Sequence, residues 1–284
     1  MFLKRIFFLL MTMLPFLDVS GQSFTIVTYN IRLETSDDGI NSWPFRKTWL
    51  CDQIKLCAAD IFCIQEGLPQ QVDFIDSAFA GFRHLGVGRE DGIRQGEFSA
   101  IFYNTHKFNV LKQSTFWLSA TPGKPSLGWD AACRRVCTYG LFQEISTGRK
   151  FWVFNTHFDH IGVEARKNSA TLILEHIKTL NKNGYPVILT GDFNSGPESE
   201  PVKIITRQFQ DSKSSDKSMS MGPDGTFNGF DATKPATERI DFIFTGYGAI
   251  AGKYYVIRES RDGRYASDHF PVVAEIRFTA SKKP

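Results

Sequence analysis

The sequence lacks the features that divide a chain into separate units. Along its 284 residues there is no long low-complexity tract, no Gly/Ser-rich linker and no repeat of fixed period. These absences exclude a repeat protein and leave no obvious domain boundary. With 42% hydrophobic and 14% aromatic residues the chain can bury a sizeable core, so we expect one large domain.

Long hydrophobic runs are also lacking, except at the N-terminus. Residues 6–17 are apolar at all but two positions, and Lys4 and Arg5 precede them. This pattern is typical of a secretory signal peptide, because the run is short for a membrane span and small residues follow it. We therefore expect a signal peptide at 1–21 and one exported domain at 22–284, periplasmic or extracellular. The sequence has no cysteine near the cleavage site, so a lipid-anchored form is not indicated. An uncleaved membrane anchor stays open as an alternative.

A strong net charge of either sign is lacking as well. The formal charge is +3, and it becomes +2 when Lys4, Arg5 and Asp18 are removed with the signal peptide. Proteins that bind nucleic acid along a broad surface usually carry an excess of basic residues. The near-neutral charge indicates no such surface, so small or neutral phosphate esters are as open as polymers.

The chain has five cysteines, and an odd number cannot pair fully within one chain. Their spacing does not match a zinc site with histidines nearby. Cys51, Cys57 and Cys63 lie in apolar contexts, where we expect them to be buried as small hydrophobic residues. Cys133 and Cys137 could form a disulfide bond in an export compartment, which stays an open alternative.

The most informative segment that is present is 186–197, PVILTGDFNSGP. Its first apolar residues predict a short buried strand. Gly191 lets the backbone turn sharply before Asp192 and Asn194, which can project the same way. A carboxylate and an amide at a strand end could hold water, a metal or a phosphate, and a simple turn after a core strand is the alternative.

Four other strand ends carry the same kind of polar group. These groups are Asn30, Glu66, Asn155 with His157, and Asp268 with His269. Each one alone fits a turn or a cap, whereas all of them together suit a metal-assisted site. Asp241 lies inside the apolar strand 239–244, where a charged residue is costly unless it is paired.

Three amphipathic helices are predicted between the strands, with Pro44, Pro69 and residue 163 near their starts. Residues 119–132 form a Pro/Gly-rich loop in which Trp129 is a recognition platform or, as we favour, a packing residue. Residues 212–220 are predicted as a mobile loop. Short strands are predicted at 226–230 and 271–278.

The chemistry that this set of residues suits is phosphoester hydrolysis. Carboxylate oxygens bind Mg²⁺ or Mn²⁺, and the ion neutralises phosphate oxygens and the leaving group. An asparagine and an aspartate can position the attacking water, and imidazoles can bind or protonate the developing oxyanion. A carboxylate hydrogen-bonded to a histidine fixes its tautomer and raises its pKa, which gives Asp241 a function.

Taken in order, the motifs resemble the endonuclease/exonuclease/phosphatase superfamily. They are TYN ending at Asn30, QE ending at Glu66, NTH ending at His157, GDFN at 191–194, RIDFIF around Asp241 and SDH ending at His269. The family includes pancreatic-type deoxyribonucleases, CCR4-type deadenylases, neutral sphingomyelinases and inositol polyphosphate 5-phosphatases. Six motifs in the right order across almost the entire mature chain make the resemblance specific. The segments NSWPFR (41–46) and GEFSAIFY (96–103) further resemble an exported branch often found in bacteria.

The resemblance implies an α+β fold, a four-layer αββα sandwich of two mainly antiparallel β-sheets flanked by helices, with the site at one edge. It also implies that Glu66 binds a divalent metal, Mg²⁺ or Mn²⁺, with help from Asn30 and Asp268. One ion or two stays open.

The same resemblance implies roles for the remaining motif residues. Asp192 and Asn194 would orient the nucleophilic water. His269, paired with Asp241, would contact the phosphate or act as acid or base, and His157 would stand on the other side of the phosphate.

One position departs from the repair enzymes of the family. Abasic-site endonucleases have an aspartate two residues after the first asparagine, where this chain has Arg32. This difference weakens both a second metal and a function in DNA repair, against which the export signal also argues. We predict Arg32 and Asn155 as substrate contacts. Glu97, Arg46 and Arg166 could support the site or be structural ion-pair partners.

We therefore expect an exported, divalent-metal-dependent phosphoester hydrolase, with a nuclease-like phosphodiesterase slightly preferred. The alternatives are a phosphomonoesterase acting on sugar or inositol phosphates and a sphingomyelinase-like diesterase acting on phospholipid head groups. A dead binding module is disfavoured because every expected catalytic residue is present. A carbohydrate-active enzyme with Glu66 and Asp192 as its carboxylate pair would leave both histidines and Asp241 unused. No obligate protein partner is indicated, and we expect a monomer.

Overall fold

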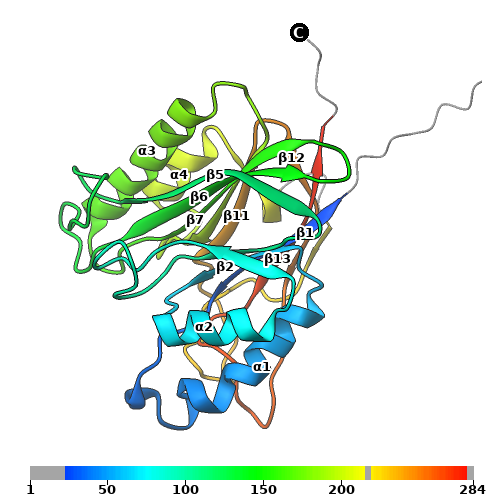
Figure 1. Ribbon diagram of the computed structural model, residues 1–284. Coiled ribbons are helices and arrows are strands. Elements are labelled where there is room, and N and C mark those ends of the chain that lie inside the picture. The colour runs from blue at the N-terminus through cyan, green and yellow to red at the C-terminus, as the bar shows by residue number, and fades with distance from the viewer. Residues whose placement is uncertain (1–22, 215–218, 280–284) are drawn as a thin grey trace, which may run out of the picture.

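Two β-sheets face each other in the structure, a computed structural model that describes residues 23–214 and 219–279. Helices cover the outer face of each sheet, so that four layers are stacked as helices, sheet, sheet and helices (Figure 1). The sequence-based expectation of an αββα sandwich is therefore confirmed. The predicted signal peptide, 1–21, lies outside the described residues.

The first sheet contains both parallel and antiparallel neighbours. β1 and β2 are parallel, as are β10 and β12, and the remaining pairs are antiparallel. Its strands, in spatial order, are β10 (Met219–Met221), β12 (Ala249–Val256), β13 (Val272–Phe278), β1 (Phe24–Asn30), β2 (Ile61–Gln65), β4 (Ile101–Asn104) and β3 (Phe82–Leu85).

The second sheet is mixed in the same way, with only β7 and β8 parallel among its described strands. The antiparallel neighbours β6 and β7 form a hairpin. Its strands, in spatial order, are β5 (Phe108–Trp117), β6 (Val136–Glu144), β7 (Lys150–His157), β8 (Val187–Asp192), β11 (Asp241–Gly246) and β9 (Gln210–Asp211).

Three apolar clusters hold the layers together. The central cluster lies between the sheets, where Phe24, Phe108 and Phe151 pack against one another. The second cluster joins the second sheet to α3 (Val163–Leu180) and α4 (Glu200–Thr206). The third joins the first sheet to α1 (Trp43–Leu56) and α2 (Pro69–Ala78). Apolar burial on this scale is the main favourable term in folding.

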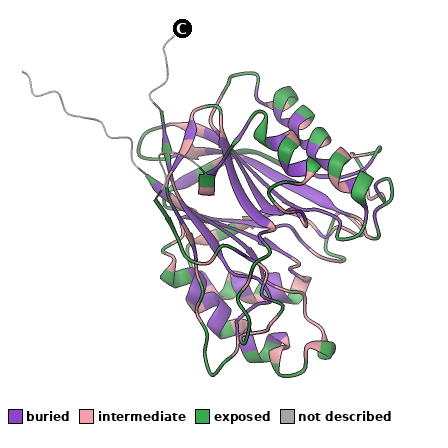
Figure 2. Cartoon of the chain, turned by 180° about the vertical axis from the view of Figure 1, so that it is seen from behind, coloured by how far each residue is buried: buried purple, intermediate pink, exposed green. Residues whose placement is uncertain are grey.

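The helices form where their apolar residues recur at helical spacing. In α3 the buried residues include Ala170, Ile173, Leu174 and Ile177, which form one stripe toward the second sheet. Figure 2 shows the same division, with buried residues along both sheets and exposed residues on the outer sides of the helices. Within residues 23–214 and 219–279, two 3₁₀ helices, η1 (Ser36–Asn41) and η2 (Ser212–Ser214), complete the helical elements.

Strand register brings polar residues to one edge of the sandwich. In the parallel pair β1–β2, Asn30 lies beside Gln65, the last residue of β2. In the parallel pair β7–β8, His157 lies beside Asp192, and the antiparallel strand β11 places Asp241 on the other side of Asp192. The carboxyl ends of parallel strands meet at the same edge, so residues far apart in sequence become neighbours.

Several local expectations differ from the structure. Strand β12 was not predicted, because Gly252 interrupts its apolar pattern at an irregularity in the pairing with β13. The predicted mobile loop at 212–220 contains η2 and the strand β10, with 215–218 outside the described residues. The segment 226–230 is no strand, because only Phe227 forms isolated bridges.

Trp129 is 42% exposed, so our preference for a packing residue is wrong. All five cysteines are free in the structure, and Cys133 and Cys137 form no disulfide bond. Cys51 and Cys63 are buried as expected, whereas Cys57 is partly exposed.

No helix within the described ranges is long and apolar enough to cross a membrane.

Replacement of Gly191 by alanine tests the close approach of β7 and β8 beneath the predicted site. Gly191 has a φ of 147°, and a Cβ atom added there would lie 2.0 Å from the backbone oxygen of Thr156. Because that oxygen belongs to a strand, the backbone must shift, and we expect Gly191→Ala to lower the free energy of unfolding by about 2 kcal/mol or more.

Urea unfolding of both variants measures the effect, with Gly196→Ala as the matched control. A Cβ added at Gly196 meets nothing within 4 Å. The control should change stability by less than about 0.5 kcal/mol. Equal stability of the two variants would contradict the predicted strain.

Candidate active site

The polar strand ends predicted from the sequence converge at one edge of the two sheets. Hydrogen bonds or short ion-pair distances connect most of them directly. The residues brought together are Asn30, Glu66, His157, Asp192, Asn194, Asp241, Asp268 and His269, with Arg32 at their margin.

Asp241 and His269 form a buried charged pair. His269 Nδ1 lies 2.8 Å from Asp241 Oδ2, and both side chains are almost completely buried. Burial lowers the pKa of His269, but the surrounding carboxylates, Asp241 foremost, together raise it more, so the pKa lies well above its usual value. The buried Asp241 carboxylate is therefore paired, as the sequence analysis required, and its negative charge helps to keep His269 positively charged.

Asp192 lies at the centre of the site. Its Oδ2 accepts a hydrogen bond of 2.9 Å from Asn30 Nδ2, and lies 3.5 Å from His157 Nε2 and 3.8 Å from His269 Nε2. Burial and the nearby charge of Asp241 raise the pKa of Asp192 to about 7. A carboxyl group with such a pKa can take up and release a proton near neutral pH.

Asn30 connects Asp192 to the next carboxylate, Glu66. The Asn30 amide nitrogen also donates to Glu66 Oε1 at 2.9 Å, and the backbone N–H of Leu33 donates to Glu66 Oε2 at 3.0 Å. Burial raises the pKa of Glu66, but these two hydrogen bonds together with the charges of His269 and Arg32 outweigh burial, and the pKa lies below its usual value. Glu66 is therefore held as a carboxylate pointing into the site.

Asp268 and Arg32 close the site on the side of the first sheet. Arg32 Nε lies 3.9 Å from Asp268 Oδ2, and the same guanidinium forms a pair of hydrogen bonds of 3.0 and 2.8 Å with Asp38. Burial raises the pKa of Asp268, and the charge of Glu66 raises it further. The Arg32 side chain keeps 31% of its surface exposed, so a substrate could reach it.

Asn194 joins Asp192 to His157. Its backbone N–H donates to Asp192 Oδ1 at 2.8 Å, and its amide nitrogen lies 3.0 Å from both His157 Nε2 and the backbone oxygen of Phe158. Burial and then the charge of Arg135 lower the pKa of His157 well below its usual value. The site therefore contains one charged imidazole, His269, and one neutral imidazole, His157.

Three site residues have backbone conformations that favour glycine. The φ angles are 55° at Arg32, 62° at Glu66 and 44° at Asn194. Each such conformation costs on the order of 1 to 3 kcal/mol unless the surrounding structure enforces it. Because three such conformations occur together, we infer that the surrounding structure enforces unfavourable backbone angles at this edge, which direct these side chains into the site.

Asn155 is the exception among the predicted residues. Its amide nitrogen donates to the backbone oxygens of Ile64 and Ala100 at 2.9 Å, and its Oδ1 accepts from Gln65 at 2.7 Å. The side chain is fully buried between the sheets. This placement corrects the prediction of a substrate contact, because both polar atoms already bind the facing sheet.

Two arginines support the site from behind. Arg46, which the sequence analysis left open, is buried and donates to four backbone oxygens of the segments that carry Asn30 and Asp268. These oxygens belong to Ile31, Arg32, Asn41 and Ala266.

Arg135 was not predicted, although it lies two residues before Cys137, which pairs with Thr156 near His157. Arg135 immediately precedes Val136, so extending β6 (Val136–Glu144) by one residue would have placed it beside the site.

Glu97 and Arg166, which the sequence analysis also left open, bind neighbouring protein groups. Glu97 lies 2.7 Å from Arg89 Nη1 and 3.9 Å from His157 Nδ1. Burial raises the pKa of Glu97. Arg166 donates to the backbone oxygen of Asp159 at 2.9 Å. Neither side chain forms a hydrogen bond with His157, Asp192 or His269 among the described contacts.

The donor set fits a divalent cation. Four carboxyl groups meet here, those of Glu66, Asp192, Asp241 and Asp268, and Asp241 Oδ1 is buried with no hydrogen-bond partner. Burial first, and then a neighbouring carboxylate, raise the pKa of both Asp192 and Asp268, so a cation bound beside them would favour their charged forms. Asp192, Asp241 and His269 have ligand atoms within 4.8 Å of one another, but the protonated His269 has no free lone pair, so the carboxylate oxygens are the candidate ligands. Hard oxygen ligands of this kind suit Mg²⁺ or Mn²⁺.

Two solved structures are similar to this chain along nearly its whole length. The mannosyl-6-phosphatase of Bacteroides thetaiotaomicron is 38% identical, with a TM-score of 0.85, over 90% of this chain and 100% of that one. A functionally unknown conserved protein of Enterococcus faecalis is 39% identical, with a TM-score of 0.84, over 90% of this chain and 100% of its own.

A curated relative matches over a shorter stretch. An uncharacterized protein of Acanthamoeba polyphaga mimivirus is 36% identical over 107 residues, which are 37% of this chain and 40% of that protein. The chain thus matches less than half the length of this relative.

A model of the endonuclease/exonuclease/phosphatase family matches residues 27–269, and the chain belongs to that family, whose members hydrolyse phosphoesters.

Proposed function

We propose that this protein is an exported, divalent-metal-dependent phosphatase that removes phosphate from a phosphorylated carbohydrate. The observation that carries the proposal is the cluster of four carboxyl groups and two imidazoles, one charged and one neutral, around Asp192. Such a cluster can bind a cation, activate a water and stabilise an anionic leaving group.

Glu66 and Asp268 are the proposed metal ligands, with Asn30 beside them. A bound Mg²⁺ or Mn²⁺ would neutralise phosphate oxygens and the charge that develops on the leaving oxygen. Asn30 holds Glu66 and Asp192 together through one amide nitrogen, so both carboxylates face the same point. Arg46 fixes the two backbone segments that carry this group.

Asp192 is the proposed general base. Its Oδ1 is held by the Asn194 N–H, which leaves Oδ2 directed toward both imidazoles. A water bound beside Oδ2 would lose its proton to Asp192 as it attacks phosphorus. Asn194 keeps that carboxylate oriented, because its backbone donates to it at 2.8 Å.

His269 is the proposed donor to the phosphoryl group. Asp241 occupies its Nδ1, so the proton on Nε2 remains available to a phosphoryl oxygen near Asp192. A fixed positive charge in a buried site stabilises developing negative charge more than it would in water. His157 faces Asp192 from the end of β7 and contributes no positive charge.

The substrate class is proposed from the similarity to the mannosyl-6-phosphatase. An identity of 38% over nine tenths of the chain favours a sugar phosphate over the phosphodiester that the motifs alone slightly favoured. The near-neutral charge of the mature chain agrees with a small substrate, because a polymeric polyanion usually meets a basic surface. Export is proposed from the signal-peptide pattern at residues 1–21.

Hydrolysis assays on the mature chain test the substrate class and the metal together. We expect phosphate release from mannose 6-phosphate with Mg²⁺ or Mn²⁺, and none with EDTA. The kcat/KM for this monoester should exceed that for bis-p-nitrophenyl phosphate by about tenfold or more, a difference of about 1.4 kcal/mol. Faster cleavage of the diester would refute the phosphatase proposal, and undiminished turnover in EDTA would refute the metal.

Replacement of Asp241 by asparagine tests the charged pair. Asp241→Asn keeps the shape of the side chain but removes the charge that holds His269 protonated, so we expect kcat to fall by about 10² to 10⁴ with a smaller change in KM. Asp224→Asn is the matched control, since the Asp224 side chain is 95% exposed. A thermal melt checks that both variants fold, and a folded Asp241→Asn protein with full activity would defeat the assignment.

N-terminal sequencing of the protein recovered after expression tests export. We expect the exported form to begin at Gln22, and a Leu9→Arg variant to remain unprocessed because a charge interrupts the apolar run. Processing of the variant at the same site, or full-length wild-type protein in the cytosol alone, would speak against a cleaved signal peptide.

A further inference from the structure

Arg135 lies beside His157, and its guanidinium is within ion-pair distance of Asp159 and Glu97. It precedes β6, and its side chain is only 6% exposed. Its Nη1 lies 3.0 Å from His157 Nδ1 and its Nη2 lies 3.0 Å from His160 Nδ1. One guanidinium thus reaches the inner nitrogens of two imidazole rings, and a planar fork of donors suits that arrangement.

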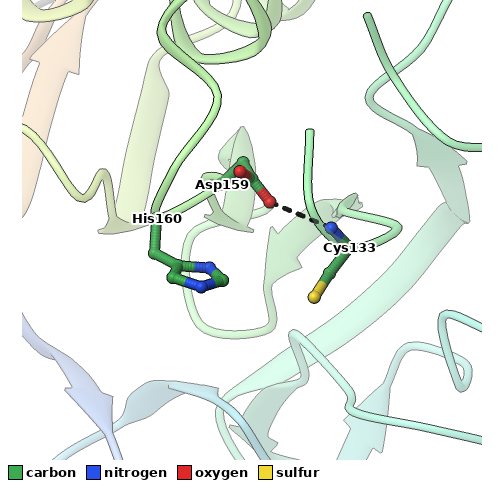
Figure 3. A group of neighbouring side chains, drawn as sticks. All are labelled: Cys133, Asp159 and His160. Atoms are coloured by element: carbon green, nitrogen blue, oxygen red, sulfur yellow. Dashed lines mark hydrogen bonds between the residues drawn. The ribbon is translucent and has the colours of Figure 1, made fainter. Parts of the chain in front are cut away.

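Asp159 anchors this guanidinium and the loop that carries it. Asp159 Oδ2 lies 3.4 Å from Arg135 Nε. The same oxygen accepts the backbone N–H of Cys133, as Figure 3 shows. Its Oδ1 accepts the N–H groups of Ala132 and Gly162 at 3.1 and 2.7 Å. Burial raises the pKa of Asp159, but these backbone donors lower it to about 2. The carboxylate is therefore a fixed structural acceptor.

The same hydrogen bonds argue against a metal site at Cys133, Asp159 and His160, whose ligand atoms lie within 4.8 Å of one another. Oδ1 of Asp159 already accepts three backbone N–H groups, and Oδ2 accepts the N–H of Cys133 and lies 3.4 Å from Arg135 Nε. Arg135 also places a positive charge at His160 Nδ1. A cation there would displace these donors and meet a like charge, so the group is better explained as the support of Arg135.

The position of Arg135 constrains the tautomer of His157. A guanidinium has N–H donors and no acceptor, so the ring nitrogen that faces it must be the unprotonated one. A neutral imidazole carries one proton, which is then on Nε2. This Nε2 lies 3.5 Å from Asp192 Oδ2, on the side where the phosphate is proposed to bind.

Two neighbours compete with Arg135 for control of the ring. The amide nitrogen of Asn194 lies 3.0 Å from Nε2 and would favour the opposite tautomer. A hydrogen bond from a charged donor is about twice as strong as one from a neutral donor. The Asn194 amide nitrogen also donates to the backbone oxygen of Phe158 at 3.0 Å, so the amide keeps a hydrogen bond when His157 Nε2 carries the proton. Glu97 lies 3.9 Å from Nδ1, too far for a hydrogen bond, and is paired with Arg89 at 2.7 Å.

We propose that Arg135 is a positioning residue that fixes His157 as the Nε2–H tautomer, so that His157 donates a hydrogen bond to a phosphoryl oxygen. The catalytic meaning of this inference rests on the proposed phosphatase function, whereas the tautomer itself does not. His157 then complements His269 by supplying a neutral donor opposite a charged one. Such fixed donors stabilise charge that develops during reaction.

Nitrogen-15 correlation spectra of histidine-labelled protein test the tautomer directly, both without metal and with Mg²⁺. The chain has six histidines, and a His157→Gln variant assigns the signal by its loss. We expect wild-type His157 to show a protonated Nε2 and an unprotonated Nδ1. Arg135→Met should lose this pattern, and Arg135→Lys should keep it, because an ammonium group is also only a donor.

Kinetics on mannose 6-phosphate provide the second measurement. We expect Arg135→Met to lower kcat by about 10- to 100-fold with little change in KM, and Arg135→Lys to recover part of the loss. Arg134→Met is the matched control, because the neighbouring Arg134 is 42% exposed and pairs with Glu90, and it should leave kcat unchanged.

A protonated Nδ1 in wild-type His157 would overturn the proposal, even if no Arg135 variant folds. A folded Arg135→Met protein that keeps both the Nε2–H tautomer and its kcat would also overturn it. Failure of the proposed function looks different: the wild type would release no phosphate from the sugar phosphate, while its spectrum would still show which nitrogen of His157 carries the proton.

Discussion

The site depends on the confinement of like charges at one edge of the sandwich. Strands β8 and β11 pair so that Asp192 and Asp241 lie directly beside each other in a region that excludes water. Two buried carboxylates repel each other. The charged His269 between them reduces this repulsion, and the raised pKa of Asp192 allows that carboxyl group to become neutral near pH 7. A divalent cation is the further compensation that the proposed function requires.

The rest of the fold holds this arrangement against its tendency to relax. The apolar cluster between the sheets fixes their separation, and the buried amide of Asn155 ties the second sheet to the backbone of the first. Arg46 ties the end of β1 to the segment before His269. Such rigid support allows Glu66 and Asn194 to keep unfavourable backbone angles while their side chains face the site.

Much of the fold could be predicted from residue patterns. Strands β1, β6, β7 and β8 carry regular apolar residues and end in polar ones, and α3 has a complete helical stripe, so both their type and their ends were recognisable. Strand β12 was missed because Gly252 breaks its pattern. Asn155 was misplaced because an asparagine before His157 looks the same in sequence whether it faces substrate or the opposite sheet.

The sequence by itself determined which chemical groups end each strand, because side-chain type and strand periodicity are local properties. It therefore identified Glu66, Asp192 and His269 before any contact was known. Only the tertiary structure decided which partners these groups meet, since hydrogen bonds between the sheets join residues up to 162 positions apart. The charge of His269, the neutrality of His157 and the contact of Arg135 with both His157 and His160 follow from burial and distance, which no local pattern encodes.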